Sequence, residues 1–410
     1  MTSLAFSVNA RRLFATSVVA RLPLGMLGIG LMVHTQRLTG SFAAAGLVTG
    51  AYAIAGGMGG PLLGQLVDRG GQTEVLLASA GGAAALLGAA AILPAHASVA
   101  LLLALATGIG LSTPPVGACL RAQLPALLPD PAALSGVYAV ETSVVELCWV
   151  CGPPLVLGLG ALWSTGGALA VSGLIVLVAT VAFAVQPASR TRRPQPSDGA
   201  RRGSALATPA MRVLTVLLLG VGLLLGADEV AVTATARTFE GSTAAAAPLL
   251  ALWGAGSFAG GLGFARLGRG RNAALLALLL FALTVGHLAL IPASGAVAAL
   301  GAVLFVAGGA IAPIEATVYA MVEDAAPAGT VTEAFAWLAG AMAVGGAGGA
   351  GAAGLVVDTA GATAAFALAA AAGALATLIA IARWRALARD PRTFRLAADA
   401  SGGAPCRSVS

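Results

Sequence analysis

Residues 273–321 read AALLALLLFALTVGHLALIPASGAVAALGAVLFVAGGAIAPIEATVYAM, two apolar runs that only the segment Pro292 to Gly295 separates. Each run reaches the roughly 20 residues with which a helix crosses the hydrocarbon of a bilayer. Leu and Ala dominate without the alternation of a barrel strand, so in lipid the backbone can satisfy its polar groups only as α-helix. The stretch predicts two transmembrane helices, 273–291 and 295–321.

Runs of the same kind fill the rest of the chain. The 410 residues are 58% hydrophobic and 9% charged, whereas a soluble domain carries about 25% charged residues. So few charges could not cover a globule in water. The sequence therefore predicts an all-α membrane protein with twelve transmembrane helices, at 12–34, 42–64, 74–94, 98–120, 132–160, 166–186, 211–236, 245–266, 273–291, 295–321, 331–355 and 363–384.

The basic residues set the expected orientation. All 22 are arginines, which is typical of a high-GC bacterial genome. If the N-terminus is cytoplasmic, nineteen of them lie in cytoplasmic segments. Only Arg37 and Arg237 lie on the outer side, and Arg21 lies within a helix. The positive-inside rule then predicts a bacterial inner-membrane protein with both termini in the cytoplasm. The same distribution explains the net charge of +6 without a nucleic-acid partner.

The composition changes abruptly after the sixth helix. Residues 187–209, rich in Pro, Ser, Gly and Arg, predict a flexible cytoplasmic linker. The expected organisation is an N-terminal bundle at 1–186, a linker at 187–210, a C-terminal bundle at 211–390 and a cytoplasmic tail at 391–410. A shift of 200 residues places Gly56 on Gly256 and Gly60 on Gly260, so the two halves are predicted to be a parallel repeat.

The loop after the second helix, GQLVDRGGQT at 64–73, resembles the signature of the major facilitator superfamily. That signature runs Gly, three residues, Asp, Arg or Lys, one residue, Gly and two bases. Four residues match it: Gly64, Asp68, Arg69 and Gly71. Gln72 and Thr73 stand where bases are usual. A degenerate second copy at 266–272 keeps Arg269 but has Gly268 opposite Asp68.

The resemblance covers nearly the whole chain and implies two six-helix bundles with substrate bound between them. It implies that Asp68 and Arg69 act in a cytoplasmic latch, whereas the alternative is an ordinary turn. Helix 132–160 contains Gly152 and Pro153, part of a motif that drug antiporters of this family carry, which hints at antiport. The expected partners are a small-molecule substrate, protons and the lipid bilayer. We expect a monomer without a cofactor or metal.

Six charged residues fall at membrane depth, away from the ends of the predicted helices: Arg21, Glu141, Glu146, Asp228, Glu229 and Glu315. Each would cost roughly 2.5–3.5 kcal/mol at a helix centre unless it is paired, neutralised or facing water. In the family's fold the third, sixth, ninth and twelfth helices face lipid, and here those spans hold an acid or an arginine only at their ends, at Glu74 and Arg383. The resemblance thus implies that the six residues line the central passage, as candidates for proton coupling or substrate binding.

Depth along the helices indicates which of these residues could meet. Arg21 lies nine residues beyond Arg12, about 13 Å in, and Glu146 lies about 21 Å into its helix. Both are near mid-depth and could pair or share a substrate. Glu146 is our first candidate for a proton-titrating carboxylate, with Asp228 or Glu229 second. The alternative is a static Arg21–Glu146 ion pair that fixes helix packing.

Other residues have plainer interpretations. Glu315 follows Pro313, so it could contact substrate or pair with a neighbouring helix. Thr330 and Glu333 form a capping box pattern, and Thr208-Pro209 and Asp130-Pro131 read as helix starts. Cys148 and Cys151 are expected to pack rather than bind zinc. The histidines, His34, His96 and His287, are expected at the outer interface.

The function expected from these features is a secondary transporter that works by alternating access, most simply as proton-coupled efflux. The alternatives are import of a small, possibly anionic metabolite and a non-transporting receptor or scaffold. An ATP-driven pump would need the lysine of a P-loop, and the chain has none. An intramembrane metalloprotease is excluded by the absence of a His-Glu-x-x-His motif.

Overall fold

The computed structural model describes residues 8–128, 131–190, 204–240, 246–267 and 272–388. Twelve helical spans in these ranges are long and apolar enough to cross a membrane, as the sequence predicts. They are α1 (Val8–Thr39), α2 (Phe42–Gly70), α3 (Gln72–Ala91), α4 with α5 (Val99–Ser112, Val116–Leu127), α6 (Pro131–Leu162), α7 (Thr165–Ala184), α9 (Pro209–Glu240), α10 (Ala246–Leu267), α11 with α12 (Ala273–Leu288, Leu290–Ala293), α13 with α14 (Val297–Gly308, Ile311–Ala325), α15 (Val331–Ala360) and α16 (Ala362–Ala382). The short elements are α8 (Pro187–Arg190), η1 (Ala205–Ala207) and α17 (Trp384–Leu387).

The fourth and tenth spans are both interrupted, at related places in the two halves. Pro114 and Pro115 follow the end of α4, because proline cannot donate the backbone hydrogen bond that would continue the helix. The tenth span breaks at Gly309 and Ala310, between α13 and α14. These matching interruptions agree with the internal repeat.

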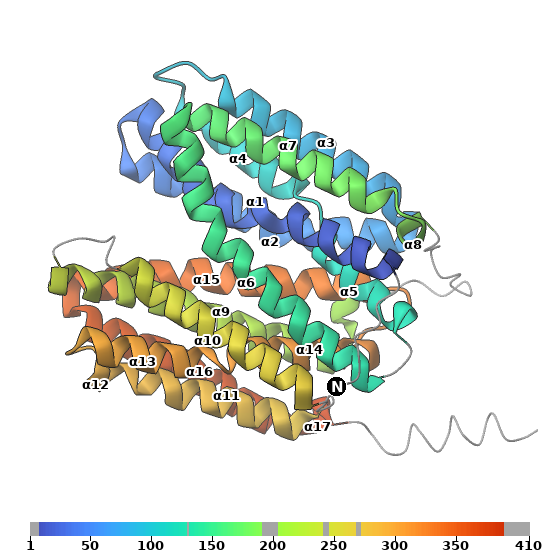
Figure 1. The fold of residues 1–410 in the computed structure, drawn as a ribbon, viewed down its shortest axis with the longest axis vertical. Coiled ribbons are helices and arrows are strands. Elements are labelled where there is room, and N and C mark those ends of the chain that lie inside the picture. The colour runs from blue at the N-terminus through green and yellow to red at the C-terminus, as the bar shows by residue number, and fades with distance from the viewer. Residues whose placement is uncertain (1–7, 129–130, 191–203, 241–245, 268–271, 389–410) are drawn as a thin grey trace, which may run out of the picture.

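The helices pack as two pseudo-symmetric bundles of six. Helix α1 packs against α6 and α7, and its counterpart α9 packs against α15 and α16. The pairs α3–α7 and α2–α4 likewise correspond to α11–α16 and α10–α13. In Figure 1 the first bundle (blue to green) and the second (yellow to red) form two separate groups, with α6 running along the face between them.

Two cross-bundle seams join the groups, and both lie toward the end that carries α8 and η1, here called the linker end. In the first seam α2 meets α15, and in the second seam α6 meets α10. Gly64 of α2 lies against Glu333, and Gly136 of α6 against Ala265. By contrast Gly46 and Gly50, near the start of α2, have open space beside them. They lie toward the opposite end of the molecule, here called the far end, where the bundles diverge (Figure 1).

The predicted helix starts have different outcomes. The Thr208 hydroxyl accepts a hydrogen bond from the Met211 N–H at 3.2 Å and so caps α9, as predicted. The prediction of a capping box at Thr330 is wrong, because the Thr330 side chain makes no cap and instead donates to the Pro327 carbonyl at 2.7 Å. Another residue takes its place, as described below. Asp130 lies outside the described residues.

Candidate functional site

A buried ionic triplet lies inside the first bundle, where α1, α5 and α6 meet. Glu141 on α6 is fully buried, and its Oε2 accepts a hydrogen bond from Arg121 Nε at 2.9 Å. Its Oε1 accepts one from Arg21 Nη1. Arg21 Nε also donates to the Ser17 carbonyl at 3.2 Å, while its Nη2 has no hydrogen-bond partner among the described residues. Two cations thus share one carboxylate, and one donor remains unused.

The triplet corrects two expectations. Arg21 pairs with Glu141 rather than with Glu146. Arg121, assigned from sequence to a cytoplasmic segment, lies within the fourth span and is only 6% exposed. The predicted span ended at residue 120, whereas α5 continues to Leu127. The missed signal was the apolar segment beyond Arg121, which lengthens the helix.

The second bundle presents an aromatic face to this triplet. Arg121 stacks on the Tyr319 ring of α14, with 4.0 Å between its Cζ and the ring centroid. The Tyr319 ring also packs against Phe335 of α15 and Tyr138 of α6, at centroid distances of 5.8 and 6.2 Å. The Tyr138 hydroxyl donates to the Arg121 carbonyl at 3.2 Å. The contacts of the Tyr319 ring with Arg121 and with Tyr138 cross between the bundles, so they must break if the bundles separate at the linker end.

Two further carboxylates lie half-buried between the bundles. The Tyr319 hydroxyl donates to Glu315 Oε2 at 3.2 Å. Glu146 of α6 accepts a long hydrogen bond, 3.4 Å, from the Ser257 hydroxyl of α10 in the opposite bundle. Glu146 and Glu315 interact electrostatically with each other, and Glu315 also with Arg121. Among the described residues neither carboxylate has an arginine as a direct ion-pair partner.

Asp68 forms a polar contact across the first seam at its linker end. Its Oδ2 accepts the backbone N–H of Glu333 at 2.9 Å, and its Oδ1 accepts that of Thr332 at 3.3 Å. A carboxylate at a helix N-terminus satisfies free N–H groups and meets the positive end of the helix dipole. Asp68 therefore provides the cap that the Thr330 pattern does not.

The Glu333 side chain turns away from its own helix terminus. Its Oε1 accepts hydrogen bonds from the Ser204 hydroxyl at 3.0 Å and from the Ala205 N–H at 3.2 Å. These residues lead into η1 and α9, so the contact stays within the second bundle. The predicted structural role of Glu333 therefore involves a partner different from the one expected.

The other residues of the predicted latch loop have distinct surroundings. A Cβ on Gly64 would lie 2.9 Å from the Glu333 Cα, so only glycine allows α2 and α15 to approach this closely. Gly71 links α2 to α3 with φ of 103°, in the region that favours glycine. Arg69 is exposed. Arg269 lies outside the described residues.

A neutral network replaces the bases that the signature usually carries. Gln72 is 2% exposed, and its Nε2 donates to the Ser189 hydroxyl of α8 at 2.6 Å. Its Oε1 accepts from Gln123 Nε2 of α5 at 2.8 Å. Amide hydrogen bonds therefore tie this loop to the start of the linker.

Asp228 and Glu229 point to different sides of α9, because adjacent residues of a helix lie about 100° apart. Asp228 is fully buried, with its Oδ2 3.2 Å from Nε2 of His287 on α11. Glu229 is exposed. His34 and His287, expected near the outer interface, are buried inside the protein. His34 contacts the Thr165 hydroxyl and the Ala90 carbonyl.

Gly152 and Pro153, the partial antiporter motif, lie where α6 crosses α1. A Cβ on Gly152 would lie 2.8 Å from the Gly25 Cα, so the pair lets the two backbones touch. The motif is thus part of the packing within the first bundle, beside the helix that carries Arg21.

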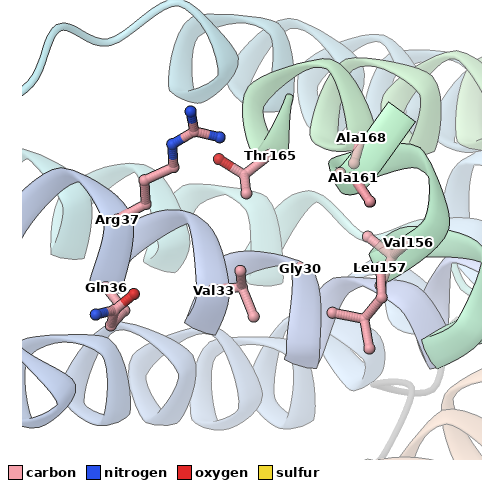
Figure 2. Close-up of a pocket in the computed structure, with 10 residues that line it drawn as sticks. Gly30, Val33, Gln36, Arg37, Val156, Leu157, Ala161, Thr165 and Ala168 are labelled. Atoms are coloured by element: carbon pink, nitrogen blue, oxygen red, sulfur yellow. The ribbon is translucent and has the colours of Figure 1, made fainter. Parts of the chain in front are cut away.

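A cavity of about 320 Å³ lies elsewhere, toward the far end of the first bundle. Residues of α1, α6 and α7 line it, with the polar groups of Gln36, Arg37 and Thr165 beside Val33 and Val156 (Figure 2). It contains none of the predicted site residues. The candidate site therefore consists of the charged residues between the bundles and not of this cavity.

Comparisons with known proteins agree with this architecture. Residues 13–311 match the family model described as Major Facilitator Superfamily. No curated protein sequence matches the chain. The fold is similar to that of the human organic anion transporter MFSD10 (TETRAN), at 18% identity and a TM-score of 0.69, over 90% of this chain and 99% of that one. It is also similar to an outward-facing bacterial homologue of the iron transporter ferroportin, at 14% identity and a TM-score of 0.75, over 92% of this chain and 99% of that one.

Proposed function

The chain belongs to the major facilitator superfamily, and we propose that it exports a small organic solute by proton-coupled alternating access. Members of this family are secondary transporters and not enzymes, and the twelve apolar helices make this chain a multi-pass membrane protein. Our proposal adds three points to the family assignment: the direction of transport, its coupling to protons and the nature of the solute.

One observation carries the proposal: the bundles touch at the linker end and diverge at the far end, with charged side chains between them. Asp68, Tyr319 and Ser257 make contacts that bridge the bundles. All three contacts are non-covalent, so a rocking motion could break them together. In this arrangement the site would be reached from the far end, and in the alternate arrangement from the linker end.

The arginines support a cytoplasmic linker end. Arg11, Arg12, Arg69, Arg190 and Arg212 all belong to segments at this end, and the positive-inside rule places such segments in the cytoplasm. The described conformation would then face outward, as the similar ferroportin homologue does. We propose a monomer in a bacterial inner membrane with both termini in the cytoplasm.

Glu146 and Glu315 are the proposed proton carriers. Both are half-buried between the bundles, where an ionised carboxylate is costly unless it is paired or reaches water. Ser257, which donates to Glu146, lies in the bundle opposite Glu146, and Arg121, whose charge acts on Glu315, lies in the bundle opposite Glu315. Rocking would therefore change the surroundings of both carboxylates. Protonation could therefore favour one arrangement over the other. Glu141 keeps its two arginines in either arrangement, because all three residues belong to the first bundle.

The unused donor on Arg21 favours a second candidate function, import of a small anion. Arg21 and Arg121 carry two positive charges against the single charge of Glu141, and Arg21 Nη2 has no partner among the described residues. A carboxylate or phosphate group could accept from it. The similar fold of an organic anion transporter is compatible with this cargo but does not select it.

Flux through reconstituted protein tests the proposal. Proteoliposomes would be loaded with ethidium as a lipophilic cation or with benzoate as a small organic anion, and flux would be followed with and without a pH gradient. Export predicts gradient-driven movement of a solute against its concentration. Glu146→Gln should abolish coupling to the gradient and retain exchange of solute between the two sides.

A matched variant separates coupling from folding. Glu74→Gln removes an exposed acid at the linker end of α3 and should leave flux unchanged. If Glu146→Gln transports with the same gradient dependence as the parent protein, Glu146 is structural and the proton-carrier assignment is wrong. If no solute moves in either direction with folded protein, a receptor or scaffold role is favoured.

A further inference from the structure

An isolated pair of titratable side chains lies inside the second bundle, outside the cluster between the bundles. Asp228 on α9 and His287 on α11 are both 0% exposed, and 3.2 Å separates Asp228 Oδ2 from His287 Nε2. The distance is that of an ion pair, although the angles do not form a hydrogen bond. Asp228 Oδ1 also has no hydrogen-bond partner among the described residues.

The hydrogen bond on the other side of the imidazole fixes how many protons the pair must hold. His287 Nδ1 lies 2.7 Å from the Leu283 carbonyl, which can only accept, so Nδ1 carries a proton. A neutral histidine then has a bare lone pair on Nε2. An ionised Asp228 would face that lone pair with an oxygen lone pair at 3.2 Å, which is repulsive. One additional proton between the two atoms removes the repulsion.

No other charged group takes the place of this proton. The neighbouring elements α12, α13 and α16 contain no charged residue. Charges on the other packed elements are Arg212, Glu229, Arg237 and Glu240 on α9, Arg266 on α10, Glu315, Glu323 and Asp324 on α14, Glu333 and Asp358 on α15, and Arg385 on α17. Among the described residues none of them bonds to Asp228 or His287, and Glu229 points about 100° away from Asp228.

Trp253 of α10 borders the pair. Its ring packs edge-on to the His287 ring, with 6.0 Å between centroids, and its buried Nε1–H has no hydrogen-bond partner among the described residues. The pair thus lies in an apolar setting with a spare donor close by. Such a setting favours a pair that holds one additional proton and has no net charge over an ionised Asp228 beside a neutral His287.

We propose that Asp228 and His287 form a proton-binding site, separate from the cluster between the bundles, that holds one proton between the two side chains. Asp228 lies nineteen residues beyond the start of α9, about 28 Å along the helix, which places the site toward the far end. The inference concerns binding alone and stands whether or not transport is coupled to protons.

Spectroscopy of the full-length protein in nanodiscs tests the site directly. Nitrogen NMR of ¹⁵N-histidine protein at about pH 8, where a free histidine is neutral, reads the protonation of His287. Infrared spectroscopy reads the carbonyl stretch of a protonated Asp228. The site predicts either a doubly protonated His287 or a carboxylic acid band from Asp228. A neutral His287 beside an ionised Asp228 would overturn the proposal.

Two variants assign these signals. Asp228→Asn supplies an amide donor to Nε2, so the pair needs no additional proton and both signals should disappear. His34→Gln removes the other buried histidine, whose ring contacts only a hydroxyl and a carbonyl, and should leave both signals intact. The wild-type spectra decide the proposal even if a variant does not fold.

Thermal unfolding gives an independent test with a defined sign. Above about pH 7 an unfolded chain has lost the second histidine proton, whereas the folded pair retains one, so folding takes up a proton. The folding equilibrium should then weaken as the pH rises, by at most about tenfold per pH unit. Asp228→Asn should remove this dependence. A pH dependence that is the same in both proteins would contradict the site.

Discussion

The two seams that close the linker end belong to equivalent helix pairs but are held by different forces. The first seam, α2 with α15, ends in a charge-assisted contact from Asp68 to backbone N–H groups. The second seam, α6 with α10, has the long Glu146–Ser257 hydrogen bond and close packing of Gly261 against Ser143. The sequence of the second loop has Gly268 opposite Asp68. A repeat can thus close the same end with a charged contact in one half and with packing in the other.

The largest expected effect comes from the ionic triplet behind the second seam. Glu141→Ala would leave Arg21 and Arg121 buried without a carboxylate and should lower the free energy of unfolding by about 3–5 kcal/mol. Size-exclusion chromatography of detergent extracts after heating would measure the loss. Glu146→Gln, on the same helix but half-buried and without an ion pair, should change stability far less. Equal losses of stability in the two variants would show that the triplet does not stabilise the fold more than an unpaired carboxylate does.

A steric change at the first seam comes next. Gly64→Ala places a methyl group 2.9 Å from the Glu333 Cα and should destabilise the closed linker end by about 1–3 kcal/mol, as overpacking does. The matched control, Gly46→Ala, lies on the same helix where no atom is within 4 Å. Thiol labelling of a cysteine at Glu333 should rise in the Gly64 variant only. Unchanged labelling would contradict the tight seam.

The smallest effect concerns the charge of the latch. Asp68→Asn keeps one acceptor oxygen but removes the negative charge from the terminus of α15, which should cost about 0.5–2 kcal/mol of the closed state. The same thiol label would report more frequent opening. Glu74→Gln removes an acid at the same end that makes no such contact and should not change labelling. If both variants open the linker end equally, the effect is one of net charge rather than of the latch.

The twelve spans could be predicted from the sequence because length and apolarity decide them. Pairing could not, because Glu141 and Glu146 are five residues apart, about 8 Å along the helix and 140° around it. Which of them meets Arg21 depends on helix rotation, which apolar composition leaves open. Arg121 was missed because positive-inside counting treats an arginine near a helix end as a loop residue.

Local patterns also failed where a residue from the other bundle intervened. Thr330 and Glu333 have the spacing of a capping box, but Asp68, 262 residues earlier than Thr330 in the sequence, accepts the Glu333 N–H that the Thr330 side chain would use. The burial of His287 had no local signal either, because its partner Asp228 lies on a different helix. Such contacts become visible only in three dimensions.

Alternating access itself can be measured with pairs of spin labels. One pair would replace Phe42 and Thr359, exposed residues at the far ends of α2 and α15. The other would replace Glu74 and Arg212, exposed at the linker end in opposite bundles. The native cysteines would first be replaced, and electron–electron distances recorded with and without Asp68→Asn.

We expect Asp68→Asn to lengthen the linker-end distance and shorten the far-end distance in the same fraction of molecules. Each pair of labels should then show two distance populations. In the variant the longer distance should gain at the linker end and the shorter distance should gain at the far end. A lengthening at both ends together, or no change at either end in folded protein, would contradict a transporter whose bundles rock about a central charged site.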